Sequence, residues 1–243
     1  MFAVFKREIT SFFTSAMAYL IIGLFLLLNG LFLWVFKGDY NILDDGFSDL
    51  SNFFLLSPWV FLFLIPAITM KSFSEEKRLG TIELLVIKPV SLAHIVGGKF
   101  LAAFSLIVTA LIPTLLYVYT LGVLNANNTS PDLGLAMGSY FGLLFLVANY
   151  VAMGIYASTI TENQIVAFIA ATTLCFLFYY GFDAIATLFG TGETVLFIRD
   201  LGMRSRVENM ARGVLDTRDI IYFMSFALFF LYMAILQLKS LKH

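Results

Sequence analysis

Few residues of this 243-residue sequence could do chemistry, and none of them stands in a catalytic pattern. Residues 97–100 read G-G-K-F and come nearest to a phosphate-binding loop. They lack the first glycine and the final hydroxyl of G-x-x-x-x-G-K-S/T, whose backbone amides hold phosphates. His94 and His243 are the only histidines, and no group of Cys, His and carboxylate residues has metal-ligand spacing. The long apolar runs hold no central acid or histidine for hydrolysis or proton-driven transport. We therefore expect no catalytic residue, no metal site, no directly bound cofactor and no ATPase site in this chain.

One polar stretch, residues 71–91, gathers many charges between two apolar runs. Ser72 followed by Glu75 fits a capping box and predicts that a helix begins there. Gly80 comes just after two cations and predicts where that helix ends. Thr81 can cap a second short helix. The stretch therefore predicts a helix-turn-helix that lies along the membrane surface.

This predicted element has two unlike sides. Ile82, Leu85 and Val86 would form an apolar underside. The solvent side would carry the charges, namely Glu75, Glu76, Arg78 and Glu83. An apolar ridge with charges at its rim suits docking into a groove of a partner protein. The alternative is an ordinary solvated loop whose charges only set the membrane topology.

The composition of the chain indicates which kind of structure positions these polar residues. Hydrophobic residues make up 60% of the chain and charged residues 13%, with 27 Phe. A soluble monomer of this composition would expose more apolar surface than such proteins tolerate, so lipid must be its solvent. A membrane span needs about 20 mainly apolar residues, and six runs qualify. We predict one all-α integral membrane domain over 1–243. Its parts are an interfacial helix at 1–13, spans at 14–36, 53–70, 96–124, 135–160, 165–182 and 220–238, the polar element at 72–90 and an outer loop at 183–219.

The distribution of cations predicts the orientation. Nine cations fall on the side of both termini in the six-span arrangement: Lys6, Arg7, Lys71, Lys77, Arg78, Lys88, Lys99, Lys239 and Lys242. The first two loops on the other side hold only Lys37. Both termini are therefore expected in the cytoplasm, with the Lys99 amine extended to the interface. The loop at 183–219 has five arginines that oppose this rule, but it also has six acids.

Three further points remain from the residues alone. Residues 1–13 carry an amphipathic pattern, although the first span could simply begin early. Residues 194–203 could dip into the bilayer as a re-entrant or interfacial segment. The net charge of −1 argues against nucleic acid as a partner.

Two motifs carry a family resemblance. Residues 75–85 read E-E-K-R-L-G-T-I-E-L-L, followed by P-V-S at 89–91, and this resembles the first cytoplasmic loop of ABC-2 type transporter permeases. Residues 206–222 resemble the last outer loop of these permeases, with matching positions at Arg212, Gly213, Asp216 and Asp219. Within the family the chain is most similar to multi-copper-enzyme-maturation-type permeases, and among these to gliding-motility-associated permease subunits of the GldF type.

The resemblance implies a six-span half-transporter of the bacterial inner membrane with a coupling helix. By position, the ATPase-coupling residues would be Glu75, Glu76, Arg78, Gly80, Thr81, Glu83 and Leu84. Two copies of a separate ABC ATPase would bind ATP and Mg²⁺, and a second permease would complete the assembly as a homodimer or a related heteromer. An extracytoplasmic partner could contact the outer loop, and lipid surrounds the spans. Gliding motility or protein secretion would be the process served.

Two alternatives stay open. The protein could be a non-transporting scaffold in a motility or secretion machine, where the ATPase transmits force across the membrane. It could also be a channel or sensor that has no ATPase partner.

Overall fold

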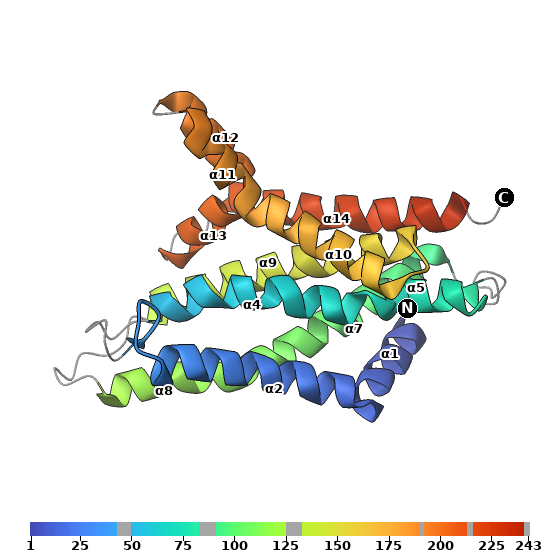
Figure 1. Cartoon of the computed structure of the whole chain (residues 1–243), viewed down its shortest axis with the longest axis horizontal. Helices are drawn as coiled ribbons and strands as arrows, with labels where there is room; N and C mark the ends of the chain where they lie inside the picture. The colour runs from blue at the N-terminus through green and yellow to red at the C-terminus, as the bar shows by residue number, and fades with distance from the viewer. Residues whose placement is uncertain (43–49, 83–90, 125–132, 190–191, 213–215, 241–243) are drawn as a thin grey trace.

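The computed structural model describes residues 1–42, 50–82, 91–124, 133–189, 192–212 and 216–240 (Figure 1). All regular structure in these ranges is helical, which confirms the predicted all-α class. The elements in chain order are α1 (Phe2–Thr14), α2 (Ala16–Gly30), η1 (Leu31–Val35), α4 (Ser51–Thr69), α5 (Lys71–Arg78), α7 (Leu92–Leu111), η2 (Ile112–Thr114), α8 (Leu115–Leu124), α9 (Leu133–Ile160), α10 (Gln164–Phe176), η3 (Leu177–Gly181), α11 (Phe182–Ala186), η4 (Thr187–Phe189), α12 (Glu193–Leu201), α13 (Met203–Ala211) and α14 (Thr217–Ser240).

Six helices in the described residues are long and apolar enough to cross a membrane, as the sequence predicted. They run over Ala16–Val35, Ser51–Arg78, Leu92–Val123, Gly134–Ile160, Gln164–Phe189 and Thr217–Ser240. Figure 1 shows both ends of the chain at one end of the bundle, together with α1 and α5. We call this the termini end. An even number of crossings brings the two termini together in this way.

Helix α9 is the centre of the bundle and packs against α4, α7, α10, α13 and α14. Two of its glycines mark the closest approaches. A Cβ atom at Gly154 would overlap the hydroxyl of Thr69 on α4, and one at Gly142 would lie 3.1 Å from the Cβ of Met210 on α13. Lipid is as apolar as a leucine side chain, so helices in a bilayer associate through such close packing of small residues.

Helix α5 continues the second span instead of starting afresh at Ser72. Only Met70 separates α4 from α5, its backbone is helical, and its N–H donates to the Pro66 carbonyl at 2.9 Å. No side-chain capping bond forms at the start of α5, and Ser72 is buried. The predicted capping box is therefore wrong, because the amides that it would satisfy follow an unbroken helical turn. The end is as predicted: α5 stops before Gly80, which has a φ of +66°.

Short helices occupy the opposite end of the bundle, where the sequence predicted re-entrant or interfacial helices. Helix α11 belongs to the last part of the fifth candidate span and, together with α12, projects away from the rest of the bundle, whereas α13 packs on α9 (Figure 1). Helices α12 and α13 meet at Gly202. The last span then begins at Thr217, three residues before the predicted residue 220.

Candidate functional site

The site at the termini end depends on how α1 lies. This helix has an amphipathic pattern and packs along α7 (Figure 1). Gly98 allows the contact, because a Cβ atom there would come within 2.9 Å of the Val4 Cβ. Ser15 then turns the chain into α2 with an extended backbone, and its hydroxyl accepts a hydrogen bond from the Met17 N–H at 3.3 Å. The polar side of α1 is thereby brought to α5 and α7.

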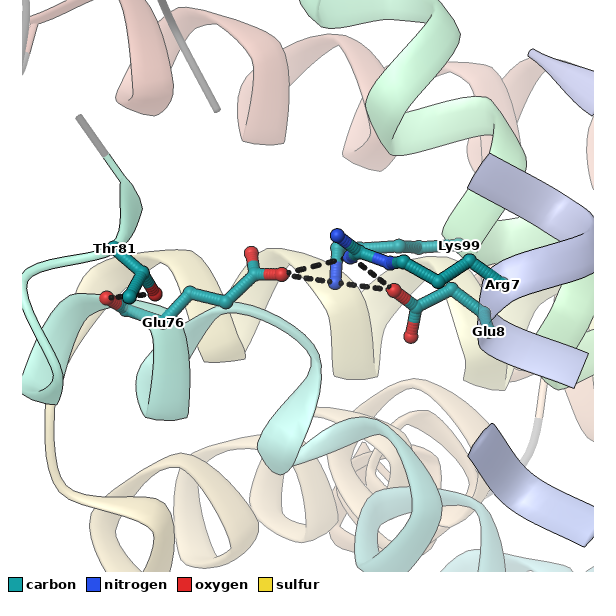
Figure 2. Close-up of polar contacts among 5 residues, drawn as sticks. All are labelled: Arg7, Glu8, Glu76, Thr81 and Lys99. Carbon is teal, nitrogen blue, oxygen red and sulfur yellow. Dashed lines mark hydrogen bonds and ion pairs between the residues drawn. The ribbon is translucent and has the colours of Figure 1, made fainter. Parts of the chain in front are cut away.

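Four charged side chains from three helices meet there in one cluster, which we call the ion cluster: Arg7, Glu8, Glu76 and Lys99 (Figure 2). The Lys99 ammonium on α7 donates to Glu8 Oε1 at 3.1 Å and to Glu76 Oε1 at 3.0 Å. Arg7 Nη2 donates to the same two oxygens, at 2.6 and 3.0 Å. Two cations thus share two carboxylates, and the four formal charges sum to zero.

Burial makes the pairing in the ion cluster strong. The Lys99 side chain is 3% exposed, and its ammonium also lies 5.0 Å from the centre of the Phe73 ring. An ammonium this deeply buried needs compensating partners. Burial raises the pKa of Glu8, but the charge of Lys99 and the hydrogen bond from Arg7 outweigh it, so the pKa lies below its ordinary value. The hydrogen bond to Glu8 raises the pKa of Arg7. The second oxygen of Glu76, Oε2, is buried and has no hydrogen-bond partner among the described residues.

Helix α5 is also fixed near its C-terminal end. Lys77 donates through its ammonium to the carbonyl of Thr159, the second-last residue of α9. The Thr81 hydroxyl donates to the carbonyl of Glu76 at 3.2 Å, and the Thr81 N–H donates to the same oxygen at 2.9 Å (Figure 2). Beyond these anchors Arg78 and Leu79 are exposed, Leu79 by 62%. The element therefore has a fixed inner side and a free tip.

The predicted coupling residues divide between these two sides. Arg78 and Gly80 lie at the exposed tip and Glu75 is half-buried. The sequence predicted Glu76 on the solvent side of the element. In the structure its carboxylate instead points inward, where it pairs with the buried ammonium of Lys99. Thr81 bonds backward to α5, and Glu83 and Leu84 lie outside the described residues.

Three members of the ion cluster were not predicted as site residues. Lys99 was expected to extend toward water and instead lies buried between two carboxylates, so that expectation is wrong. Its isolation in an apolar run was the available signal, since a lone cation there needs a partner. Arg7 and Glu8 gave no comparable signal.

The outer-loop residues that match the family motif do not form one site. Asp219 is buried at the start of α14 and accepts from Arg206 at 2.7 Å. Asp216 accepts from the Arg218 N–H at 2.9 Å and so caps α14. Arg212 is exposed at the end of α13, and Gly213 lies outside the described residues. The described motif positions therefore lie in different surroundings: a buried ion pair, a helix cap and an exposed helix end.

Within the part of the chain that the structure describes, no three His, Cys, Asp or Glu side chains lie close enough together to hold a metal ion. The ion cluster is filled by its own side chains and offers ionic contacts between helices, with no nucleophile beside a base. These contacts can therefore hold α5 in place relative to α1 and α7, or pass a displacement of α5 on to those two helices.

Comparison with protein families agrees with this architecture. The family model for the ABC-2 family transporter protein matches residues 2–201, from α1 to the end of α12. A search of curated proteins returns no match. Membrane subunits of this family normally lack an ATPase site of their own and work with an ABC ATPase. The match covers most of the chain and includes α1, α5 and α7, and the six apolar helices suit a multi-pass membrane protein. The chain therefore belongs to the ABC-2 transporter family, as a permease subunit of an ABC transporter.

Proposed function

We propose that this permease subunit receives motion from a separate ABC ATPase at the tip of α5 and passes it to the spans. One observation carries the proposal: Glu76 of α5, the helix that continues α4, is bonded to Lys99 on α7. A force on α5 would therefore act on the second and third spans together. Glu8 would make α1 move with them, because it shares the same ammonium.

The tip of α5 has the chemistry of a docking surface. Leu79 is a large exposed apolar side chain, and Arg78 beside it supplies charge. Apolar anchors near charged rims are typical of protein interfaces. The resemblance to ABC-2 permeases implies that the separate ATPase would bind ATP and Mg²⁺. The excess of cations on the termini side supports a cytoplasmic location for α5 in the bacterial inner membrane.

We further propose an assembly of two permease subunits, identical or related, with two ATPase copies. The resemblance of residues 75–85 and 206–222 to gliding-motility-associated permeases supports export or force transmission in motility or secretion as the output. Flux measured in proteoliposomes containing the whole complex would separate export from force transmission without solute movement.

The docking proposal is tested by charge and polarity changes at the tip. Leu79→Asp and Arg78→Glu should reduce the ATPase recovered with the tagged permease from native membranes by about tenfold or more, as loss of an interface anchor does. Lys71→Glu is the matched control, since Lys71 is exposed at the other end of α5. Lys99→Met should retain the bound ATPase but lower coupled turnover.

The outcomes are distinct. The permease purified alone should hydrolyse no ATP. Equal ATPase recovery with wild type and both tip variants would show that the tip of α5 is not the docking surface. Unchanged coupled turnover in Lys99→Met would show that the ion cluster does not transmit the motion.

A further inference from the structure

A cavity of about 500 Å³ lies at the end of the bundle opposite the termini. Its walls come from the first turns of α4 and α9, the middle of α8, Tyr179 of η3, and α13. Figure 1 shows the first turns of α4 and α9 close to α13, with α8 on the other side of α4. The volume is in the range of sites that hold small molecules, about 300–1,000 Å³. None of the residues in the ion cluster contributes to it.

The cavity wall is largely apolar, with side chains such as Phe54, Leu121 and Val207. Two of its polar side chains are already occupied. The Ser139 hydroxyl donates to the Ala211 carbonyl at 3.3 Å, and Glu208 is paired with an arginine on its own helix at 2.8 Å. A ligand would therefore meet mainly hydrocarbon inside the cavity.

Arg212 is a cationic side chain of this wall that has no carboxylate partner among the residues that the structure describes. Among the described residues, Arg199 is paired with Asp183, and Arg204 and Arg206 are likewise paired with carboxylates. Arg212 is exposed at the rim and makes no ion pair within the described part of the chain. The rim is also close to the membrane surface, because it lies at the first residues of two spans, where lipid head groups are found.

We propose that this cavity binds a bilayer lipid with an anionic head group, one acyl chain filling the apolar interior and the phosphate pairing with Arg212. The acyl chain gains little free energy by moving from the bilayer into an equally apolar cavity. The head group therefore decides which lipid is preferred. Because Arg212 is exposed, a single ion pair with a head group corresponds to a preference of about fivefold at most for an anionic over a zwitterionic lipid. Such a lipid would hold α13 against α4, α8 and α9.

The test uses the full-length protein in phosphatidylcholine nanodiscs that contain a trace of lipid with a photoreactive acyl chain. The probe is either phosphatidylglycerol or phosphatidylcholine at equal mole fraction, and mass spectrometry locates the labelled peptides. Wild type should be labelled on the cavity-lining peptides of α4, α9 and α13, up to about fivefold more by the anionic probe.

Variants separate the contact with the lipid head group from the contact with the acyl chain. Arg212→Gln should abolish the preference, and Arg212→Lys should keep it. Arg218→Gln is the matched control, because Arg218 is also exposed but does not line the cavity. Ala136→Trp should fill the cavity and lower labelling by both probes. Equal labelling by the two probes in wild type, or labelling in Arg212→Gln that still prefers the anionic probe, would overturn the proposal. Arg212 is exposed, so its variants test the idea even where the Trp variant does not fold.

Discussion

Replacing Lys99 with methionine should destabilise the protein by removing the central charge of the ion cluster. Methionine keeps a similar length and an apolar stem, so packing against Phe73 changes little. The electrostatic change is large, because Glu8 and Glu76 lose a buried ammonium at 3.1 and 3.0 Å. The local charge falls from zero to −1.

The magnitude follows from burial. Removing one partner of a fully buried ion pair costs about 3–5 kcal/mol. Here the carboxylate side chains of Glu8 and Glu76 are still 15% and 17% exposed, and Arg7, 51% exposed, remains bonded to both. Partial access to water and one surviving cation reduce the cost, so we expect a loss of about 2–3 kcal/mol in the free energy of unfolding.

The assay is reversible unfolding of the purified protein in mixed micelles, titrated with a denaturing detergent. Lys71→Met on α5 is the matched control and should change stability by less than about 0.5 kcal/mol, since Lys71 is exposed. The triple variant Glu8→Gln, Glu76→Gln, Lys99→Met should recover most of the loss, because it leaves no uncompensated carboxylate. A Lys99→Met variant as stable as the Lys71→Met control, or a triple variant less stable than Lys99→Met, would refute the reasoning.

Three further predictions concern other parts of the molecule. Glu8 has a folded-state pKa below its ordinary value of 4.5, so its stabilising effect is complete above pH 4.5 and is lost as the pH falls through the lowered value. In Glu8→Gln the free energy of unfolding should therefore depend less steeply on pH in that range. A pH profile identical to that of the wild type would contradict this. Gly154→Ala should destabilise the protein by about 1–3 kcal/mol in the same micelle assay, because the added methyl group overlaps Thr69 of α4. Gly23→Ala, where the added methyl group has nothing within 4 Å, should be neutral or stabilising. Equal effects of the two substitutions would count against the close packing at Gly154. Asp219→Asn should destabilise by about 1–3 kcal/mol because it weakens a buried ion pair, whereas Asp216→Asn at an exposed site should cost less, and the reverse order would show that the pair is unimportant.

Much of the fold could be predicted because a membrane span is a local property of the chain. About 20 apolar residues in succession must form a helix in lipid, where each backbone polar group has to be satisfied within the segment. The end of α5 could be predicted for a similar reason, since Gly80 adopts a positive φ that other residues avoid. The family motif at 75–85 is equally local.

The prediction that α5 begins at Ser72 was wrong because local sequence signals can conflict. Ser72 and Glu75 fit a capping box, but a cap forms only where amides lack partners. The helix of the second span runs through Met70, so those amides are already inside a helix. Whether the helix breaks there depends on how α5 packs on α9 and α10, which no window of sequence contains.

The sequence by itself determined six crossings, the polar element after the second span and the absence of a phosphate-binding motif. The tertiary structure alone decided which charges meet: Glu8 and Lys99 are 91 residues apart, and Glu76 and Lys99 are 23 apart. The contact between Glu8 and Lys99 requires α1 to lie along α7 at Gly98, a packing that depends on residues of both helices at once. Electrostatic energy depends on distance and burial in space, and neither quantity can be read from positions along the chain.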